Sequence, residues 1–406
     1  MRVLIQMGDS YPDESPCAKR MRTFYEVLTD RGHEVFVLAP DFNKTFYSDD
    51  KSVVADRKGV IYCKTIKLKK KTVIYRFLNS FVFALNSYKK SKSIENIDVV
   101  ISTCPPPLIN YYGYRIARYH HAKLVYDVRD IWPDVAWEMG SFSKGSIFSI
   151  VFKKIRNFML KHADMTVAVS PGKVDKLLNY RSQLVPVSIP NVYEITNGLD
   201  ETFLLNEVNM EVVDRYHLKD NFNVIYFGNI GLAQGLEQLL EVALKSKDKG
   251  YNAHFLLFGT GANESILKKY KEEHSLDNVD FVGRIPNRDI YTVLRYSQIS
   301  FVSLVNGNLK DSVPTKLFEA LGVGCPVLLS ACGDSVEILN RTGLGIAVNP
   351  NCSEELWNAF ERMYMNIDSF YTNREQALKV ILDDYSRQKA AVKFEKLLIS
   401  LIEGDK

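Results

Sequence analysis

The segment Asp311–Pro326, DSVPTKLFEALGVGCP, carries the residues best suited to chemistry. It follows a predicted strand, and Pro314 or Thr315 is expected to open a helix because proline is favoured in a first helical turn. The free N–H groups there and the Lys316 ammonium suit an anion such as a diphosphate. Glu319 lies one turn later on the same face, where it can accept hydrogen bonds from a ribose diol. The alternative is an ordinary surface Lys–Glu pair.

Two glycine-rich turns follow other predicted strands. Phe227–Gly235 reads FGNIGLAQG, and Phe258–Gly261 reads FGTG. Such strand–turn–helix connections let backbone N–H groups approach phosphates. Neither turn matches G-x-G-x-x-G, and no Walker lysine follows, so both can also be simple tight connections.

A third candidate is Asp127–Asp134, DVRDIWPD, which leaves a further predicted strand. Its carboxylates lie three and four residues apart, beside Arg129 and Trp132. This pattern fits a general-base or sugar-binding loop at the carboxyl end of a sheet. It fits equally a structural loop bridged by the arginine.

Several familiar patterns do not occur in the sequence. There is no D-x-D triplet and the seven histidines are scattered, so we expect neither a metal site nor a cofactor. There is no G-x-S-x-G elbow, which argues against a serine hydrolase. The missing G-x-G-x-x-G with a later acidic residue argues against a dinucleotide oxidoreductase.

The elements that must position these residues alternate between β-rich and helical stretches. Near-continuous apolar strands separated by helices predict parallel sheets covered on both faces. We therefore predict an α/β protein with two doubly wound domains facing each other across a cleft, where ligands bind at the carboxyl ends of the strands. The strands expected in the first block are Arg2–Met7, Glu34–Leu38, Val60–Ile66, Asp98–Ser102, Leu124–Val128, Met165–Val169 and Leu184–Ser188. Those of the second are Asn223–Phe227, Ala253–Phe258, Val279–Val282, Ile299–Ser303, Pro326–Leu329 and Gly345–Val348.

The predicted domain boundary lies in Ile189–Leu199, IPNVYEITNGL, which is rich in Pro, Asn and Gly. The first domain is expected to span residues 1–192 and to include a C-terminal helix, residues 386–406, that returns to it. The second is expected to span residues 193–385.

Composition narrows the class of protein. A chain of 406 residues that is 46% hydrophobic and 25% charged is neither disordered nor collagen-like. Its six cysteines are scattered, which indicates reduced thiols. No uncharged apolar run approaches the length of a membrane span, and the first residues lack a secretory cleavage site, so we expect a cytoplasmic protein.

The charge is unevenly distributed along the chain. Residues 1–200 carry 30 Lys and Arg against 20 Asp and Glu, whereas residues 201–406 carry 22 against 28. Two basic amphipathic stretches lie in the first half, Val73–Leu85 and Ile147–Lys161. The first is preceded by Lys67, Lys69, Lys70 and Lys71 and followed by Lys89, Lys90 and Lys92. They suit an anionic membrane surface, or are ordinary helices with solvated basic ends. Nucleic acid is disfavoured, because these cations do not interleave with stacking aromatics.

Seven motifs occur in a specific order: RGHEVFVLAP (Arg31–Pro40), DVRDIWPD (Asp127–Asp134), ADMTVAVSP (Ala163–Pro171), IPN (Ile189–Asn191), YFGNIGLAQGLEQLL (Tyr226–Leu240), FVGRIP (Phe281–Pro286) and VPTKLFEALGVGCPV (Val313–Val327). With these the chain resembles the retaining glycosyltransferases of family 4, which have the GT-B fold. It is most similar to the bacterial subgroup that builds O-antigen and capsule repeats with N-acetyl-fucosamine-type sugars. The likeness spans nearly the whole chain.

The resemblance implies a nucleotide-sugar donor held by the second domain. Glu319 matches the later glutamate of the family's Glu-x7-Glu motif, and Asp311 stands at the earlier position near the donor sugar. Gln234 stands where relatives carry lysine, so Lys316 and the helix N-terminus would carry more of the charge. The implied donor-binding residues are Gly231, Gln234, Gly261, Arg284, Ile285, Pro314, Thr315, Lys316, Leu317 and Glu319.

The resemblance also implies an acceptor site in the first domain. Ser15 lies near the place of the family's usual Gly-Gly, and Arg129-Asp130 stands where many relatives have His-Asp. Acceptor binding is therefore assigned to Ser15, Arg129, Asp130 and Trp132. Catalysis is assigned to Lys316, Glu319, Asp130 and Asp311.

The implied activity is metal-independent transfer, with retention, of an N-acetylated hexosamine or 6-deoxyhexosamine. The sugar would pass from UDP to a polyprenyl-diphosphate-linked saccharide at the inner face of the plasma membrane. Two alternatives remain open on the same fold: a UDP-sugar 2-epimerase and a non-catalytic assembly partner.

Overall fold

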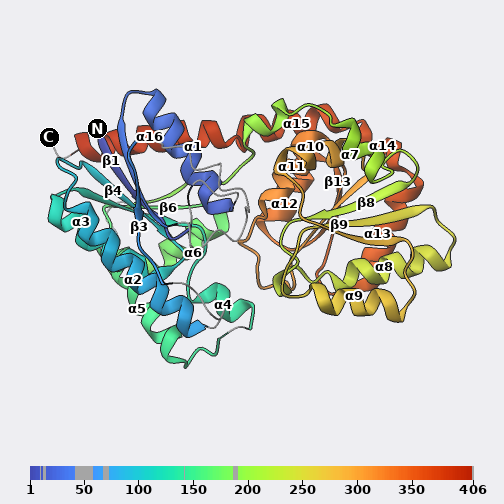
Figure 1. The fold of residues 1–406 in the computed structure, drawn as a ribbon, viewed down its shortest axis with the longest axis horizontal. Helices are drawn as coiled ribbons and strands as arrows, with labels where there is room; N and C mark the ends of the chain where they lie inside the picture. Colours follow the sequence, from blue (N-terminus) through green and yellow to red (C-terminus); the bar gives the residue numbers. More distant parts are fainter. Residues whose placement is uncertain are drawn as a thin grey trace. The chain divides into compact units, whose positions relative to one another are not determined.

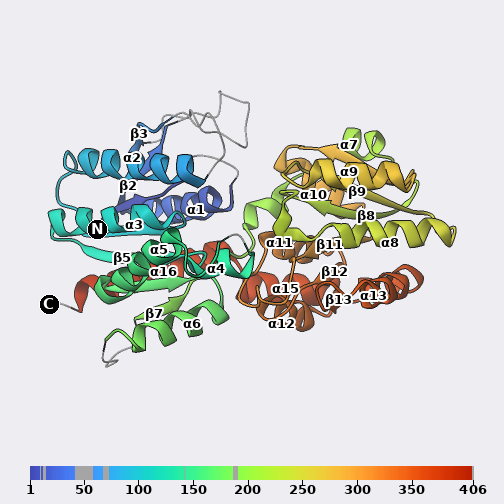
Figure 2. The same cartoon turned by 90° about the horizontal axis from the view of Figure 1, so that it is seen from below.

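The computed structural model describes residues 1–9, 11, 15–41, 58–66, 73–140, 142–185 and 191–404. The chain divides into two compact units, Met1–Asn197 with Arg387–Lys406, and Gly198–Ser386. Each unit is built on one parallel sheet with helices packed against it (Figures 1 and 2). The predicted α/β class, with two Rossmann-like domains, is confirmed.

The sheet of the first unit orders its described strands β3-β2-β1-β4-β5-β6-β7, all parallel. Every residue of the central β4 is buried, as expected for a strand covered on both faces. The bounds are β1 Arg2–Gln6, β2 Glu34–Pro40, β3 Val60–Cys63, β4 Val99–Cys104, β5 Lys123–Val128, β6 Met165–Ala168 and β7 Val192–Glu194.

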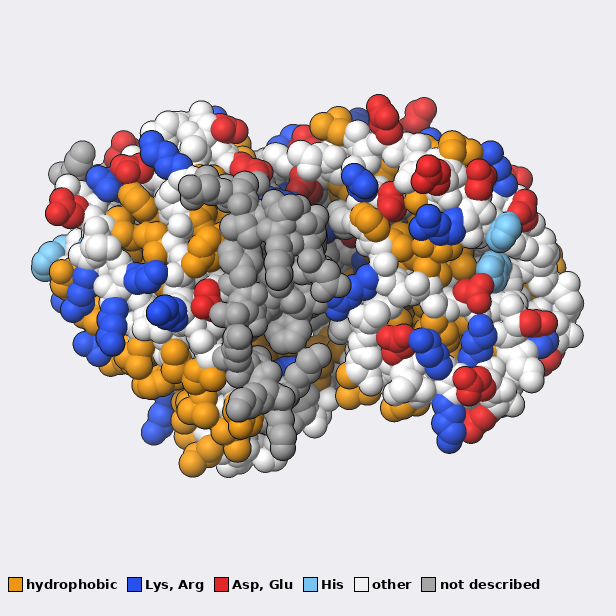
Figure 3. Space-filling model, in the orientation of Figure 1, with side chains coloured by type: hydrophobic (Ala, Val, Ile, Leu, Met, Phe, Trp, Pro, Cys, Tyr) orange, Lys and Arg blue, Asp and Glu red, His pale blue; other side chains and the backbone are white. Residues whose placement is uncertain are grey.

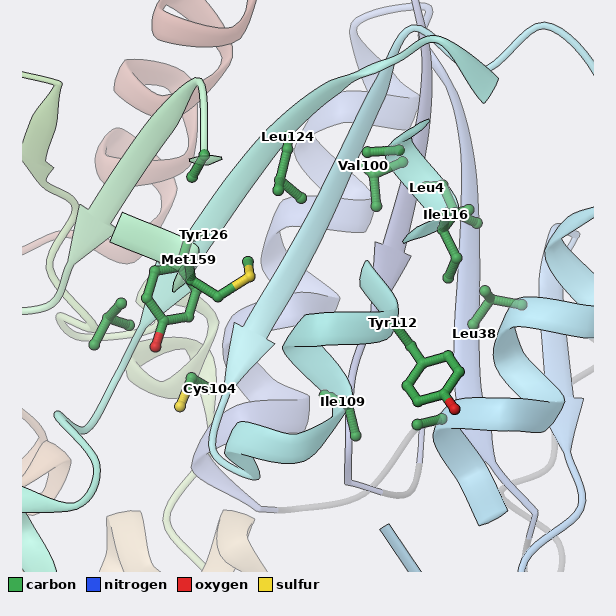
Figure 4. Close-up of a cluster of buried hydrophobic side chains, with 14 of the residues drawn as sticks. Leu4, Leu38, Val100, Cys104, Ile109, Tyr112, Ile116, Leu124, Tyr126 and Met159 are labelled. Atoms are coloured by element: carbon green, nitrogen blue, oxygen red, sulfur yellow. The ribbon is translucent and has the colours of Figure 1, made fainter. Parts of the chain in front are cut away.

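Helices cover both faces of this sheet, because successive strand residues point to opposite sides. On one face Leu4 packs with residues of α2 (Val73–Ser91), α3 (Pro107–His120), α5 (Ile147–His162) and α6 (Pro171–Ser182) (Figure 4). On the other, Val3 and Ile5 pack with α1 (Pro16–Asp30) and the C-terminal α16 (Arg387–Glu403).

The C-terminal helix belongs to the first unit, as predicted. Phe394 of α16 packs on Phe24 of α1, with ring centroids 4.8 Å apart. Glu395, which is buried, pairs with Arg31 and with His33 Nε2 at 2.9 Å. A buried carboxylate with two partners holds the end of the chain on the first sheet.

The second unit orders its described strands β10-β9-β8-β11-β12-β13, again parallel. The bounds are β8 Phe222–Phe227, β9 Ala253–Phe258, β10 Val279–Gly283, β11 Ile299–Ser303, β12 Val327–Ser330 and β13 Gly345–Val348. Its helices are η3 Glu201–Leu205, α7 Met210–Arg215, η4 Leu232–Gln234, α8 Glu237–Asp248, α9 Glu264–Glu273, α10 Asn287–Arg295, α11 Thr315–Val323, α12 Asp334–Thr342, α13 Ser353–Met365, α14 Ile367–Tyr371 and α15 Arg374–Asp384. The core forms on Phe255, Phe301, Phe360 and their neighbours.

The division between the units, at Asn197 and Gly198, lies within the predicted stretch Ile189–Leu199, but the last strand of the first sheet was expected in the wrong place. The seventh strand of the first sheet is β7, inside the predicted linker 189–199, where Val192 pairs with Thr166 of β6. The expected strand Leu184–Ser188 is not the edge strand: Leu184 and Val185 follow α6 in a turn, and residues 186–188 lie outside the described residues. Pairing with β6 overrode the Pro- and Asn-rich composition, which is tolerated at a sheet edge.

Candidate functional site

The strand order of the second sheet reverses between β8 and β11. Doubly wound sheets bind ligands at such a switch point, beyond the carboxyl ends of the strands. The turn after β8 and the segment after β11 meet there, since Val305 N–H donates to Ala233 O at 2.8 Å. Two of the three sequence signals, the glycine turn and the Lys316 helix, therefore share one edge of one sheet.

Helix α11 begins at Thr315 with Pro314 at its N-cap, and no side chain of the described residues caps it. The N–H of Leu317 bonds to Pro314 O at 3.0 Å. The N–H groups of Thr315 and Lys316 have no acceptor among the described residues. An uncapped N-terminus with two free donors is a site where an anion is favoured.

The side chain of Lys316 folds back over the end of β8. Its Nζ lies 3.8 Å from the centroid of the Tyr226 ring and 5.9 Å from that of Phe227. Burial lowers the pKa of Lys316 to about 7, and the charge of Glu319 raises it in part. The site thus holds an amine that a bound anion would charge.

Close backbone packing brings the two glycine turns together beside this amine. A Cβ on Gly259 would lie 1.8 Å from Gly228 O, and one on Gly261 would lie 2.1 Å from Ile230 O. Ile230 N–H donates to Thr260 O at 3.0 Å, and Asn263 N–H donates to Ile230 O at 3.0 Å. Any side chain at Gly259 or Gly261 would push the turns apart.

Gly231 and Gln234 lie in the turn after β8, close to each other. The Gln234 side-chain Oε1 is buried without a hydrogen-bond partner among the described residues. It lies 2.9 Å from where a Cβ on Gly231 would be. Gln234 thus presents a polar atom at this turn, where the resemblance led us to expect donor contacts.

The other predicted donor residues fall into distinct positions around α11. Glu319 is 9% exposed, and Asp311 is partly exposed in the loop before the helix. Arg284 is exposed, and its Nε donates to Thr260 Oγ1 at 3.0 Å. Ile285 beside it is half-buried. The Leu317 side chain is fully buried in the core, so this residue can offer a ligand little.

In the first unit, the outer two carboxylates of the segment Asp127–Asp134 are structural; Asp127 lies in β5, and Asp134 begins α4 (Asp134–Glu138). Asp127 is fully buried and pairs with Arg20 Nη2 at 2.8 Å while accepting from Thr103 Oγ1 at 2.7 Å. Asp134 is also buried and pairs with Arg156 Nη1 at 2.8 Å. Both side chains are therefore committed to holding the loop on its sheet.

Asp130 differs from its two neighbours. It is half-buried, and its carboxylate has no hydrogen-bond or ion-pair partner among the described residues. Arg129 beside it donates through Nε to Thr103 Oγ1 at 3.1 Å and through Nη2 to Pro105 O at 2.9 Å. Asp130 is thus the carboxylate of this loop that remains available to a ligand.

The remaining predicted acceptor residues have structural surroundings. The Oγ of Ser15 accepts from Ala18 N–H at 3.1 Å as the N-cap of α1, and it also donates to Asp9. Trp132 packs edge-on against Phe152 at 5.6 Å, and its indole N–H is buried without a partner among the described residues. Ser15 is occupied by helix capping, whereas Trp132 keeps an unused donor.

Two residues that matter to these sites were not assigned any role from the sequence. Tyr226 lies in β8, and Arg20 lies in α1, 107 positions from its partner Asp127. Only contacts between distant segments mark them. Among the described residues, no group of three His, Cys, Asp or Glu side chains could hold a metal ion.

The amphipathic helices of the first unit leave apolar side chains at the surface. Figure 3 shows hydrophobic side chains gathered over the ends of α2 and α5 that lie beside α4 (Asp134–Glu138). We call this the α2–α5 surface; it comprises the exposed side chains of Ile74, Leu78, Phe81, Ile147 and Ile150. Arg76, Lys153 and Lys154 are exposed on the same helices, whereas the predicted Lys67, Lys69, Lys70 and Lys71 lie outside the described residues. No helix in the described ranges is long and apolar enough to cross a membrane.

Comparison with known proteins matches each unit to a family. Residues 18–201 match the model Glycosyltransferase Family 4, and residues 213–377 match Glycosyl transferases group 1. The chain is 25% identical over 281 residues to the probable glycosyltransferase WbjE of Pseudomonas aeruginosa, covering 68% of each chain. It is 23% identical to the putative colanic acid biosynthesis glycosyl transferase WcaI of Escherichia coli, covering 88% of this chain and 90% of that protein.

Solved structures share the fold over the whole chain. Sucrose-phosphate synthase from Thermosynechococcus elongatus superposes with a TM-score of 0.81 at 17% identity and full coverage of both chains. HepE of Anabaena, solved in complex with UDP and glucose, superposes with a TM-score of 0.75 at 14% identity, covering 98% of this chain and all of HepE. These likenesses are to proteins of the GT-B fold.

Proposed function

We propose that this chain, a GT-B glycosyltransferase of the family 4/group 1 type, transfers a sugar with retention from UDP to a polyprenyl-diphosphate-linked saccharide. The sugar is an N-acetylated hexosamine or a 6-deoxyhexosamine, in the synthesis of a bacterial surface polysaccharide. The observation that carries the proposal is the uncapped N-terminus of α11 with Lys316 at the switch point of the second sheet. That arrangement suits a diphosphate leaving group.

The donor site follows from the chemistry around α11. The Lys316 amine and the N–H groups of Thr315 and Lys316 bind the diphosphate, and the Glu319 carboxylate accepts hydrogen bonds from the ribose hydroxyls. Arg284 and Ile285 flank the base, and Gly231 lets the turn after β8 approach the phosphates. Support for a UDP donor comes from HepE, one structure of which is a complex with UDP-glucose.

Catalysis rests on stabilising the leaving group. As the bond from the sugar to the diphosphate breaks, the sugar becomes oxocarbenium-like and the diphosphate gains charge. Donors already in place at the phosphates, Lys316 and the α11 N–H groups, stabilise that charge without reorganising. The diphosphate takes the acceptor's proton on the same face, and Asp130 orients the acceptor hydroxyl. No protein nucleophile and no metal ion takes part.

The lipid-linked acceptor requires an approach to a membrane. The α2–α5 surface combines exposed apolar side chains with Arg76, Lys153 and Lys154, which is the composition of an interfacial helix pair. Such a surface binds anionic lipid through apolar burial and charge together. We propose that the protein works as a peripheral protein at the inner face of the plasma membrane.

The donor assignment is tested by binding UDP to the wild-type chain and to Glu319→Ala. Loss of two hydrogen bonds to the ribose predicts that the variant binds about tenfold or more weakly, measured by calorimetry. GDP shares the diphosphate and the ribose with UDP, so the same loss of affinity in the Glu319→Ala variant is expected when GDP is the ligand. Equal affinity of both proteins for UDP would remove Glu319 from the ribose.

The reaction itself is tested by product analysis. With a UDP-N-acetylhexosamine and a lipid-linked saccharide, the expected product is a longer saccharide with the anomeric configuration retained. An altered nucleotide sugar formed without any acceptor would instead identify an epimerase. Absence of both products and of donor hydrolysis would leave a non-catalytic partner.

Membrane binding is tested separately by flotation with vesicles that contain phosphatidylglycerol. The wild-type protein is expected to float at low salt, and Ile147→Ser with Ile150→Ser is expected to weaken flotation. A wild-type protein that stays in the bottom fraction at low salt would contradict the membrane proposal while leaving the donor site intact.

A further inference from the structure

Lys316 is half-buried, and the partner of its amine is unusual for a lysine. Among the described residues, no carboxylate oxygen lies within 4.0 Å of its Nζ. The amine instead faces the Tyr226 ring at 3.8 Å, and a Cβ on Gly228 would lie 3.1 Å from it. An aromatic face attracts a cation but balances its desolvation only in part.

Tyr226 is itself held rigidly. Its side chain is fully buried in β8, and its hydroxyl donates to Asn229 O at 2.6 Å. One residue therefore touches Lys316 with its ring and fixes the following glycine turn with its hydroxyl. Both contacts lie beside the position proposed for the diphosphate.

We propose that Tyr226 is a positioning residue that holds the Lys316 amine at the donor site, and that a nucleoside diphosphate binds together with a proton taken up by this amine. This inference rests on the proposed donor site. The diphosphate then forms an ion pair with the Lys316 ammonium, which has just gained its charge.

The surroundings of the amine support this protonation step. Burial lowers the pKa of Lys316 to about 7, and Glu319 is the ionised group that opposes the shift. Tyr226 is the titratable group in contact, and burial raises its pKa, so it stays neutral. Helices α10, α15 and η3 also pack against α11. None of their described ionisable groups contributes, beside Glu319, to the pKa of Lys316.

The sign of the effect follows from these groups. An anion beside a lysine favours its charged form, so the pKa of Lys316 rises when the diphosphate binds. Near pH 8 the empty site is mostly neutral and binding takes up close to one proton. Near pH 6 the amine is already charged, and uptake falls towards zero. Above pH 7 the Kd is therefore expected to rise, by up to about tenfold per pH unit.

The experiment is calorimetric titration of the full chain with UDP at pH 8 in Tris and in HEPES. The terminal phosphate of UDP is fully ionised there, because its second pKa lies near about 6. A difference in heat between the buffers, matching close to one proton per site, is expected. Binding with equal heats would overturn the inference and leave the donor site standing. No UDP binding at all would overturn both.

Lys316→Arg is the matched control for the proton. A guanidinium stays charged throughout, so above pH 7, where the UDP phosphate is ionised, this variant is expected to bind UDP with no proton uptake and with a Kd independent of pH. Proton uptake equal to that of the wild-type protein would place the proton elsewhere and overturn the inference.

Tyr226→Phe and Tyr226→Leu separate the ring from the hydroxyl. The phenylalanine variant keeps the ring and is expected to keep the wild-type pH dependence of the Kd. The leucine variant loses the ring, which is expected to weaken UDP binding about fivefold to tenfold and to move the pH dependence to lower pH. A leucine variant with wild-type affinity and pH profile would show that Tyr226 has no positioning role.

Discussion

The loop after β5 and the start of α11 present the same kind of sequence signal and have different fates. Both put charged residues at the carboxyl end of a central strand in a parallel sheet. In the first unit, Asp127 and Asp134 are buried in ion pairs with Arg20 and Arg156. In the second, the Lys316 amine lies over the Tyr226 ring and has no carboxylate partner among the described residues, at a helix N-terminus that no described side chain caps.

The difference separates charged residues that are paired within the protein from charged residues that are available to a ligand. A buried charge with a good partner stabilises its own loop and has little left for a ligand. A half-buried charge whose partner is weak, such as Lys316, remains costly until something binds. Asp130 is an intermediate case, because it is half-buried in the same segment as Asp127 and Asp134, whose carboxylates are both paired with arginines.

Breaking the Arg20–Asp127 pair should damage the fold most. Arg20→Leu leaves a buried carboxylate with one hydroxyl donor, which predicts a loss of about 3–5 kcal/mol in the free energy of unfolding. Urea denaturation measures it. The double variant Arg20→Leu, Asp127→Leu should recover much of that loss, because no charge is left unpaired. A loss below about 1 kcal/mol for the single variant would mean the pair is not structural.

Removing the Lys316 amine should damage activity without damaging the fold. Lys316→Ala is expected to lower kcat/KM by about 30-fold or more, equal to about 2 kcal/mol of transition-state stabilisation. Steady-state kinetics of sugar transfer measure it, with thermal unfolding as a check on folding. Near-normal turnover would contradict the leaving-group role.

Asp130 and Asp134 offer a matched pair of variants in one loop. Asp130→Asn is expected to lower transfer about tenfold, since a charge-assisted hydrogen bond to the acceptor is weakened, with UDP affinity and Tm unchanged. Asp134→Asn is expected to lower Tm instead, because Arg156 loses its carboxylate. Equal effects of the two changes on stability would remove the distinction drawn between them.

The smallest effect concerns the cost of keeping Lys316 without a carboxylate partner among the residues that the structure describes. Its pKa is lowered in the folded chain, so between about pH 7 and 10 the unfolded chain binds more protons and the wild-type protein gains stability as pH rises. Lys316→Met should therefore stabilise the fold by about 1 kcal/mol near pH 6, with a smaller gain near pH 9, allowing for partial solvent screening. Urea denaturation at both pH values measures it. A gain that grows with pH would contradict the sign.

The sequence alone was sufficient for the parallel sheets and for the helix at Thr315, because near-continuous apolar strands and proline in a first turn are local signals. It also placed the glycine turn and Lys316 at strand ends. It did not locate β7, because Val192–Glu194 is short and its partner β6 lies more than twenty residues earlier.

Contacts between distant segments determine which charges are paired. Asp127, Asp130 and Asp134 look alike in sequence, and only contacts with Arg20, Arg156 and Tyr180 separate them. In the same way, Tyr226 gained its role from a helix ninety residues later. Local propensity fixes where an element begins and which face is apolar, whereas the environment of a charge depends on segments that meet only after folding.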